Sequence, residues 1–350
     1  MKAARWHGLK DMRVDDIPVP GVRPGTVKIK VKWCGICGSD LHEYTTGPVM
    51  VPIDKPHPLT KEQAPVVFGH EFSGEVVEVG EGVTKYKAGD RVVVEPIYNC
   101  GKCPACRSGK YNRCEMLGFY GVIGGGGGFS EYTVTPEKMV HKIPDNMTFE
   151  QGALVEPTAV AVHAVRKSKL RIGDSVAVFG TGPIGLLTIM AAKAAGAARV
   201  IAVEVSQERK QYAAKVGADI VLDPTEIDVV EEIHRLTGGG VDISFEVAGI
   251  EEVLNQAIDS VKFDGQVVVI SVWEQRAAID PNKLLFKECD VIGTIGYCDI
   301  FPGVIKLIAD GRIKADELVT KKIDIDNVVS DGLEALLAEK NQIKILVKPD

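Results

Sequence analysis

The glycine-rich stretch at residues 175–196 constrains the fold of this chain most strongly. It reads SVAVFGTGPIGLLTIMAAKAAG: an apolar run, glycines in a G-x-G-x-x-G pattern, and then an apolar helix-forming segment. Between a strand and a helix, such glycines let the backbone turn tightly and approach a pyrophosphate at the helix N-terminus. The stretch therefore predicts a dinucleotide-binding strand–turn–helix unit rather than glycines that serve packing alone. The candidate cofactor-binding residues in it are Gly180, Gly182, Pro183, Ile184 and Gly185.

An acidic residue follows at the distance that such units require. Glu204 ends the next apolar run, RVIAVE, 19 residues after Gly185. A carboxylate there hydrogen-bonds the adenosine ribose hydroxyls and repels a 2′-phosphate, which favours NAD over NADP. Arg209 lies five residues further on and offers a positive charge to a 2′-phosphate. The sequence therefore predicts NAD and leaves open how strictly NAD is preferred over NADP.

The two parts of the chain show different periodicities. After about residue 151, the apolar strands 199–204, 219–223, 241–249 and 265–271 alternate with the helical segments 206–218, 226–238 and 250–261. Near-continuous apolar strands separated by helices predict a doubly wound parallel sheet of the Rossmann type, and hence an α/β fold. The tail adds helix-like segments at 301–313 and 327–340 and a last strand at 343–348.

The first 150 residues instead contain short β segments with few helical stretches between them. They alternate apolar and polar residues or form short apolar runs at 26–33, 72–80, 90–96 and 129–136, which predicts a β-rich, barrel-like domain. The five-glycine run 124–128 leads into a strand rather than a helix, so we expect it to be a flexible surface loop.

Four cysteines lie within the 16-residue segment NCGKCPACRSGKYNRC: Cys100, Cys103, Cys106 and Cys114. Four thiolates surround a tetrahedral Zn²⁺ completely, as in a structural zinc site. An iron–sulfur cluster also takes four cysteines, but its usual spacings differ, and free thiols are the remaining alternative. We predict a structural zinc lobe at about 96–116.

Bulk composition narrows the class of protein. The chain has 350 residues and a net charge of -7, with no long basic run, so a nucleic-acid partner is not expected. Eight cysteines in such a chain suggest metal binding or catalysis rather than disulfides. The uncharged stretch 175–192 is interrupted by glycines and a proline, which do not suit a membrane span. The first residues contain no apolar core of signal-peptide length. We expect a cytoplasmic, soluble protein.

Further polar residues are scattered through the first domain. Cys34 and Cys37 have the spacing of a redox pair or of half a zinc knuckle, and Ser39 and His42 follow them. His70 and Glu71 are adjacent, and Glu156 precedes a proline where a helix is expected to begin. Taken singly, each of these residues is compatible with a purely structural role.

The order of these motifs resembles the zinc-dependent medium-chain dehydrogenase/reductase family over essentially the whole chain. The motifs are GICGSDLHEY (35–44), GHEFSGEVVEVGEGV (69–83), KAGDRVVVEP (87–96), the four-cysteine lobe, EP (156–157) and GTGPIGLL (180–187). The resemblance implies a GroES-like catalytic domain at 1–155, a Rossmann NAD-binding domain at 156–292 and a return of 293–350 to the catalytic domain. It also implies two zinc ions per chain, NAD, and assembly as a homodimer or homotetramer.

The resemblance also implies roles for individual residues. Cys37 and His70 match ligands of a catalytic zinc, with Glu71 or Glu156 as the third ligand and the other acting through water; Cys34 matches no ligand position. Ser39 and His42 match a proton relay, and Tyr44 and Tyr297 substrate-contacting positions. Zinc in such a site polarises the substrate alcohol and lowers its pKa, which promotes hydride transfer to the nicotinamide.

Within the family, four segments are similar to members that oxidise a vicinal diol, (R,R)-2,3-butanediol, to acetoin: residues 57–75, 92–103, 149–170 and 268–274. Polyol-oxidising members carry an arginine where this chain has Gly296, and its loss fits a shorter diol with apolar ends. Oxidation of sorbitol, of another polyol or of threonine is the alternative. A non-enzymatic zinc- or dinucleotide-binding protein and a thiol-redox protein using Cys34 and Cys37 are alternatives of other classes.

Overall fold

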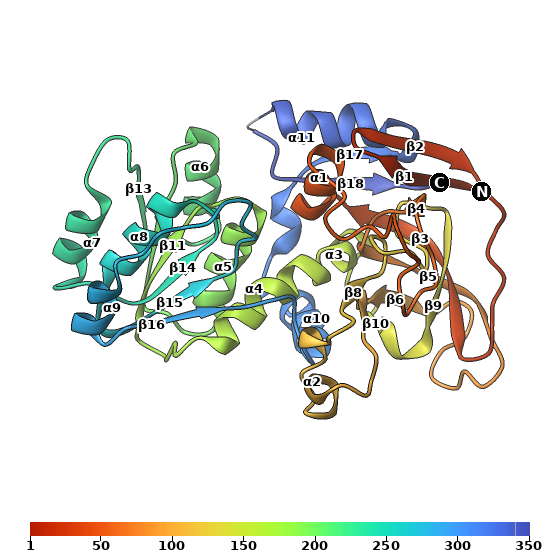
Figure 1. Cartoon of the computed structure of the whole chain (residues 1–350), viewed down its shortest axis with the longest axis horizontal. Coiled ribbons are helices and arrows are strands. Elements are labelled where there is room, and N and C mark those ends of the chain that lie inside the picture. The colour runs from red at the N-terminus through yellow and green to blue at the C-terminus, as the bar shows by residue number, and fades with distance from the viewer. Residues whose placement is uncertain (340) are drawn as a thin grey trace. The chain divides into compact units, whose positions relative to one another are not determined.

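The computed structural model describes residues 1–339 and 341–350 and divides into two compact units (Figure 1). The first unit comprises Met1–Glu156, Phe301–Asp310 and Ala315–Asp350, and the second comprises Pro157–Ile300 and Gly311–Lys314. By this division the chain rejoins the first unit at Phe301, whereas the sequence suggested a boundary at residue 293. Within the described ranges, no helix has both the length and the apolar character needed to cross a membrane.

The second unit is built on a six-stranded sheet in the order β13-β12-β11-β14-β15-β16, in which every pair is parallel. Its strands are β11 (Ser175–Phe179), β12 (Arg199–Val203), β13 (Ile220–Leu222), β14 (Val241–Glu246), β15 (Val261–Val269) and β16 (Asp290–Gly293). The strand order reverses between β11 and β14, and dinucleotides bind at such a switch point. The predicted doubly wound parallel sheet is confirmed.

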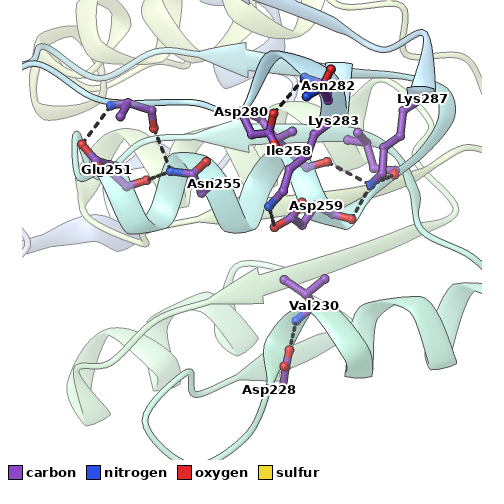
Figure 2. A network of polar contacts seen from close by, with 12 residues as sticks. Asp228, Val230, Glu251, Asn255, Ile258, Asp259, Asp280, Asn282, Lys283 and Lys287 are labelled. Carbon is purple, nitrogen blue, oxygen red and sulfur yellow. Dashed lines mark hydrogen bonds and ion pairs between the residues drawn. The ribbon is translucent and has the colours of Figure 1, made fainter. Parts of the chain in front are cut away.

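Six helices accompany this sheet: α4 (Val155–Lys167), α5 (Pro183–Ala194), α6 (Gln207–Lys215), α7 (Val229–Thr237), α8 (Glu251–Ser260) and α9 (Pro281–Lys287). Figure 2 shows how polar contacts fix two of them to each other. Lys283 Nζ lies 2.7 Å from Asp259 Oδ2, and Lys287 Nζ donates to the carbonyls of Ile258 and Asp259 at the end of α8. Cations at a helix C-terminus stabilise its last carbonyls, so this network anchors the short helix α9.

The first unit contains a seven-stranded sheet with the path β10-β6-β5-β3-β18-β17, where β9 also pairs with β3, and smaller sheets β2-β1-β4 and β7-β8. The N-terminal strands are β1 (Lys2–Gly8), β2 (Asp11–Asp16), β3 (Thr26–Gly35), β4 (Val66–Val67), β5 (Glu71–Val79), β6 (Arg91–Val94), β7 (Ile97–Tyr98), β8 (Gly118–Phe119), β9 (Tyr132–Pro136) and β10 (Val140–Lys142). Short helices α1 (Gly38–Thr45), α2 (Pro104–Arg107), α3 (Phe149–Ala153) and α10 (Phe301–Ala309) belong to this unit. The β-rich character of this domain is confirmed.

The C-terminal tail contributes two strands to the large sheet of the first unit. These are β17 (Val319–Asp324) and β18 (Lys344–Lys348), and β18 pairs antiparallel with β3. The helix predicted over 327–340 is wrong in detail: a π-helical turn at Val328–Leu333 precedes a short α11 (Glu334–Ala338), and residue 340 lies outside the described residues. Gly332 lies within this π-helical turn, and a Cβ there would come 2.6 Å from Ile36 Cδ1.

The glycine run 124–128 is not the surface loop that its composition suggested. Gly124, Gly127 and Gly128 are buried. A Cβ on Gly127 would lie 2.4 Å from the Phe68 carbonyl oxygen, and one on Gly128 would lie 2.6 Å from Cys34 Sγ. The glycines are needed because the backbone packs directly against neighbouring strands.

Candidate active site

The four cysteines of the lobe converge on one point. The sulfur atoms of Cys100, Cys103, Cys106 and Cys114 all lie within 4.8 Å of one another. Backbone amides also point at the sulfurs: Cys103 N–H donates to Cys100 Sγ at 3.3 Å, and Met116 N–H donates to Cys114 Sγ at 3.3 Å. Hydrogen bonds from the backbone of Lys102 and Cys103 lower the pKa of Cys100 to about 6. Four cysteine sulfurs gathered at one point fit a zinc ion without an open position.

A second group of potential ligands lies where α1 meets the start of β5. Ligand atoms of Cys37, His70 and Glu71 lie within 4.8 Å of one another. Cys37 is the residue before α1, while His70 and Glu71 come at the start of β5 and are 4% and 0% exposed. Sulfur, nitrogen and oxygen donors in one buried group suit zinc, and three protein ligands leave a position for a substrate.

Asp40 connects two of these residues. Its Oδ2 accepts a hydrogen bond from Cys37 N–H at 2.9 Å, and its Oδ1 lies 3.5 Å from His70 Nδ1. Burial by itself lowers the pKa of His70, but the Asp40 carboxylate and the Cys37 sulfur outweigh it, so that the pKa is raised well above its usual value. With Nδ1 facing Asp40, the other ring nitrogen of His70 is directed elsewhere and lies 3.4 Å from Ser39 Oγ.

The remaining predicted residues of this region are placed as follows. Glu156 is buried in the first turn of α4, and it acts electrostatically on the ammonium of Lys344. Among the described residues, the 4.8 Å ligand group takes in Glu71 but not Glu156. Ser39 and His42 both lie on α1, three residues apart and hence on one face of the helix. Their relay role stays a prediction.

The two predicted substrate-contacting tyrosines are both buried. Tyr44 is 4% exposed, and its hydroxyl donates to Glu334 Oε1 at 2.7 Å. Burial, with Glu334 beside the hydroxyl, raises the pKa of Tyr44 to about 12. Tyr297 is 0% exposed and belongs to the second unit. The structure thus gives Tyr44 a partner within the first unit, and the substrate-contacting role of both tyrosines stays a prediction.

The glycine loop has the geometry of a dinucleotide site. Gly180 follows β11 with φ of 90°, Gly182 is the N-cap of α5, and Pro183 is its first residue. A Cβ on Gly185 would lie 2.0 Å from the Gly180 carbonyl oxygen, whereas a Cβ on Gly182 would meet nothing within 4 Å. Packing therefore requires a glycine at position 185. At position 182 the missing side chain leaves the backbone at the N-terminus of α5, the helix that also contains Ile184, accessible to a ligand.

Glu204 lies after β12 and is 7% exposed. Its carboxylate accepts from Thr181 N–H at 2.8 Å and Thr181 Oγ at 3.0 Å, and from the N–H groups of Val205 and Ser206, each at 2.9 Å. Glu204 thus also ties the glycine loop to the turn after β12. Arg209 lies in α6, close to the glycine loop, and its buried Nε has no hydrogen-bond partner. Its guanidinium places a positive charge near this loop.

The fold and the two ligand groups define the class of protein. Residues 23–145 match the alcohol dehydrogenase GroES-like domain, and residues 183–310 match the zinc-binding dehydrogenase domain. The chain belongs to the zinc-dependent medium-chain dehydrogenase/reductase family, and it is an oxidoreductase of the alcohol dehydrogenase type that uses zinc and a nicotinamide dinucleotide.

Individual relatives match over their full lengths. The chain is 58% identical to (R,R)-butanediol dehydrogenase of Bacillus subtilis, over 100% of both chains, and 35% identical to sorbitol dehydrogenase of the same organism, over 100% of this chain and 98% of the relative. The crystal structure of 2R,3R-butanediol dehydrogenase from Bacillus subtilis superposes with a TM-score of 0.96 over 100% of this chain and 99% of that chain. A putative zinc-binding dehydrogenase from Sinorhizobium meliloti bound to NADP is 34% identical, with a TM-score of 0.91 and 99% of each chain covered.

Two residues that contact the site were not predicted from the sequence. Asp40 lies three residues after Cys37. An acidic residue at this spacing commonly caps a helix N-terminus, so the sequence did contain a signal for its position. Lys344 contacts both carboxylate oxygens of Glu71 at 2.9 and 2.8 Å from the last strand of the chain. Nothing in its surroundings, IKILVK, indicates a partner 273 residues away.

Proposed function

We propose that this protein catalyses the reversible, NAD-linked oxidation of (R,R)-2,3-butanediol to acetoin, with two zinc ions per chain. The observation that carries the proposal is the buried group of Cys37, His70 and Glu71 in a chain that is 58% identical to a butanediol dehydrogenase along its whole length. The more distant identity to a sorbitol dehydrogenase, 35%, supports the polyol alternative less well.

In this proposal, residues of the first unit hold the catalytic zinc and transfer the proton. Cys37, His70 and a glutamate hold the catalytic zinc, which when bound polarises the substrate oxygen and lowers the pKa of its hydroxyl. Oxidation removes a hydride from the carbinol carbon to the nicotinamide and a proton from the hydroxyl. The Ser39 hydroxyl accepts this proton as it gives up its own towards His42, and His42 releases a proton to solvent; the two residues are three apart in α1 and so lie on one face of the helix.

A kinetic panel tests the substrate. We expect zinc-replete enzyme to reduce NAD with resolved (R,R)-butanediol at a kcat/KM at least roughly tenfold above that for sorbitol or threonine, about 1.4 kcal/mol of preference. Equal or higher kcat/KM for sorbitol reassigns the protein to polyol oxidation. Ser39→Ala is expected to reduce turnover at neutral pH about 10²-fold, and full turnover in this variant removes the relay.

Metal analysis and cofactor titration test the cofactors. Four sulfurs in the lobe and the separate group at Cys37 support two zinc ions per chain, whereas a value of one favours a non-enzymatic or degenerate zinc protein. The Glu204 carboxylate at the glycine loop supports NAD. Arg209 at the same loop predicts measurable, weaker use of NADP. None of the eight cysteines forms a disulfide in the structure, and we propose that the protein works in the cytoplasm, where thiols stay reduced.

We also propose that the chain assembles as a homo-oligomer through the edge strand β16. This strand pairs only on one side, with β15, in the described sheet. Apolar side chains near it are exposed: Phe263 75%, Leu285 67%, Phe286 74% and Val291 36%. A second copy related by a twofold axis pairs its own β16 with this edge, and each copy then covers the exposed apolar side chains of the other.

Light scattering tests this interface. Phe286→Glu is expected to shift the mass in solution to that of a smaller species, because it places a charge in the covered patch. Ile172→Glu is the matched control: Ile172 is 87% exposed and lies before β11, outside the patch. A monomeric wild type, or equal dissociation in both variants, rules out assembly through β16.

A further inference from the structure

Glu246 is a buried carboxylate at the end of β14 that is held by three neutral donors. Its Oε1 accepts from the N–H groups of Ala248 at 2.7 Å and Gly249 at 2.6 Å, and its Oε2 accepts from the Ser271 hydroxyl. The residue is 0% exposed. None of the three donors carries a charge, so they satisfy the carboxylate as an acceptor but do not neutralise it.

The hydrogen bonds alone do not require a negative charge at position 246. Both amides donate to one oxygen, which the side chain of a glutamine also offers, and the Ser271 hydroxyl can accept as well as donate. A buried charge without a cation is costly, because it loses its hydration. The two segments that Glu246 ties together, 247–250 (VAGI) and 270–272 (ISV), contain no charged side chain. The charge therefore points to a functional reason.

Glu246 lies at the edge of the sheet where a dinucleotide binds. The strand order reverses between β11 and β14, and a dinucleotide lies across such a switch point with one nucleoside on each half of the sheet. Glu204, after β12, marks the half that takes the adenosine. The nicotinamide half therefore falls to the side of β14 and β15 (Figure 1), and Glu246 is the last residue of β14 on that side.

The segment that Glu246 ties down packs closely against the glycine loop. A Cβ on Gly180 would lie 3.2 Å from Ala248 Cβ and 3.3 Å from Ala248 N. Gly249 has φ of 72°, and a Cβ there would lie 3.0 Å from the carbonyl oxygen of Val272, whose side chain is exposed. The Glu246 carboxylate is thus buried behind the loops that follow β14 and β15, next to the first glycine of the cofactor motif.

The charge of the nicotinamide ring changes during the reaction. The ring is cationic in NAD and loses its positive charge when it gains a hydride, so a fixed negative charge on its side of the sheet stabilises the oxidised form over the reduced form. We propose that Glu246 supplies this charge, which strengthens the binding of NAD relative to NADH and favours release of NADH after the alcohol is oxidised. The inference rests on the nicotinamide dinucleotide of the proposed function and not on which alcohol is oxidised.

The test is the ratio of the dissociation constants for NAD and NADH after Glu246→Gln, measured by NADH fluorescence titration and competition. The amide keeps the acceptor for both N–H groups and removes only the charge. We expect Kd for NAD to rise relative to Kd for NADH by about fivefold or more. Kd for ADP-ribose, which lacks the ring, should stay at its wild-type value. Glu246→Asp keeps the charge and should keep the wild-type ratio, even if both affinities fall together.

Asp242→Asn is the matched control. Asp242 is the other acidic residue of β14, roughly 13 Å from Glu246 along the strand, and its carboxylate accepts from Ser175 N–H at 2.7 Å. Removal of this charge at the opposite end of the strand should leave the ratio of the two constants unchanged. An unchanged ratio in Glu246→Gln, or an equal change in Asp242→Asn, overturns the proposal.

A second pair of variants keeps the test decisive if Glu246→Gln fails to fold. Ser271→Lys places an ammonium beside the carboxylate and neutralises it in place, whereas Ser271→Met adds a side chain of similar length without a charge. The ratio of Kd for NAD to Kd for NADH should be higher in Ser271→Lys than in Ser271→Met, and equal ratios overturn the proposal. A wild type that binds neither NAD nor NADH instead refutes the use of this cofactor, and hence the proposed function itself.

Discussion

Asp40 Oδ1 lies 3.5 Å from His70 Nδ1, and both atoms are buried without another hydrogen-bond partner. The second oxygen of the same carboxylate accepts from Cys37 N–H at 2.9 Å. One buried side chain in the first turn of α1 therefore orients two proposed zinc ligands that are 33 residues apart in the sequence. Partners of this kind set the tautomer and orientation of a metal-binding histidine.

Asp40→Asn should weaken the proposed catalytic zinc site without touching its ligands. An amide keeps the acceptor for Cys37 N–H but presents N–H donors to His70 Nδ1, which favours the tautomer whose proton is on the ligating nitrogen. We expect about 10–100-fold weaker zinc binding at this site and a matching loss of kcat/KM. Chelator titration followed by metal analysis measures it. Asp11→Asn, which breaks a surface pair with Arg13, is the control and should bind zinc as wild type does.

Cys106→Ser tests whether the lobe is structural. Loss of one of four thiolates should empty that zinc site, reduce the zinc content by one per chain and lower the Tm, because zinc binding there is coupled to folding of the lobe. Turnover per remaining zinc should persist at low temperature, since the other metal group uses different residues. Cys289→Ser, at a buried cysteine of the second unit, should leave the zinc content unchanged. Complete inactivation of folded Cys106→Ser at all temperatures contradicts a purely structural lobe.

Gly185→Ala and Gly182→Ala separate packing from cofactor binding in the glycine loop. The Cβ at 185 would lie 2.0 Å from a backbone oxygen, while the one at 182 meets no protein atom within 4 Å. We expect Gly185→Ala to destabilise the second unit by about 3 kcal/mol, the upper range for overpacking, and to lower Tm by roughly 6–10 °C.

Gly182→Ala should keep the wild-type Tm but bind NADH more weakly, by about 10-fold or more, because its methyl group points at the pyrophosphate site. Calorimetry and fluorescence titration of both variants measure these effects, and identical behaviour of the two would contradict the division of roles.

The sequence predicted those parts of the molecule whose signals are local. Glycines, a strand and a helix in one short stretch specify the dinucleotide loop, and cysteines at close spacing specify the lobe, because each pattern contains its own geometric reason. The Rossmann sheet was predictable for the same reason, since each strand–helix unit repeats the pattern. The resemblance to a family then added Cys37 and His70, which periodicity alone left open.

What the sequence did not predict depends on contacts between distant segments. Lys344 and Glu71 are 273 residues apart, and only the pairing of β18 with β3 brings them together. The glycine run 124–128 looked like a loop because composition does not show which backbone a glycine touches. Glu204 was assigned to a ribose, and the structure adds four protein donors to the same carboxylate. Such roles follow from packing, which a single sequence does not encode locally.

Asp223 should give the second unit a stability that depends on pH. A hydrogen bond from Lys210, with further donors on Thr225, lowers the pKa of Asp223 from 3.8 to about 2. A carboxyl whose pKa is lower in the folded state stabilises the protein above the unfolded pKa and loses this contribution as pH falls through the folded pKa. The stabilising effect of Asp223 is therefore complete above about pH 4 and disappears towards pH 2.

We expect Asp223→Asn to lower Tm at pH 7, and the difference in Tm from wild type to shrink steadily between pH 4 and pH 2. Lys210→Met, which removes the largest cause of the shift, should narrow this window because the pKa of Asp223 then returns towards 3.8. Thermal melts of the three proteins at fixed ionic strength measure the effect, and a difference in Tm that stays constant over this range contradicts it.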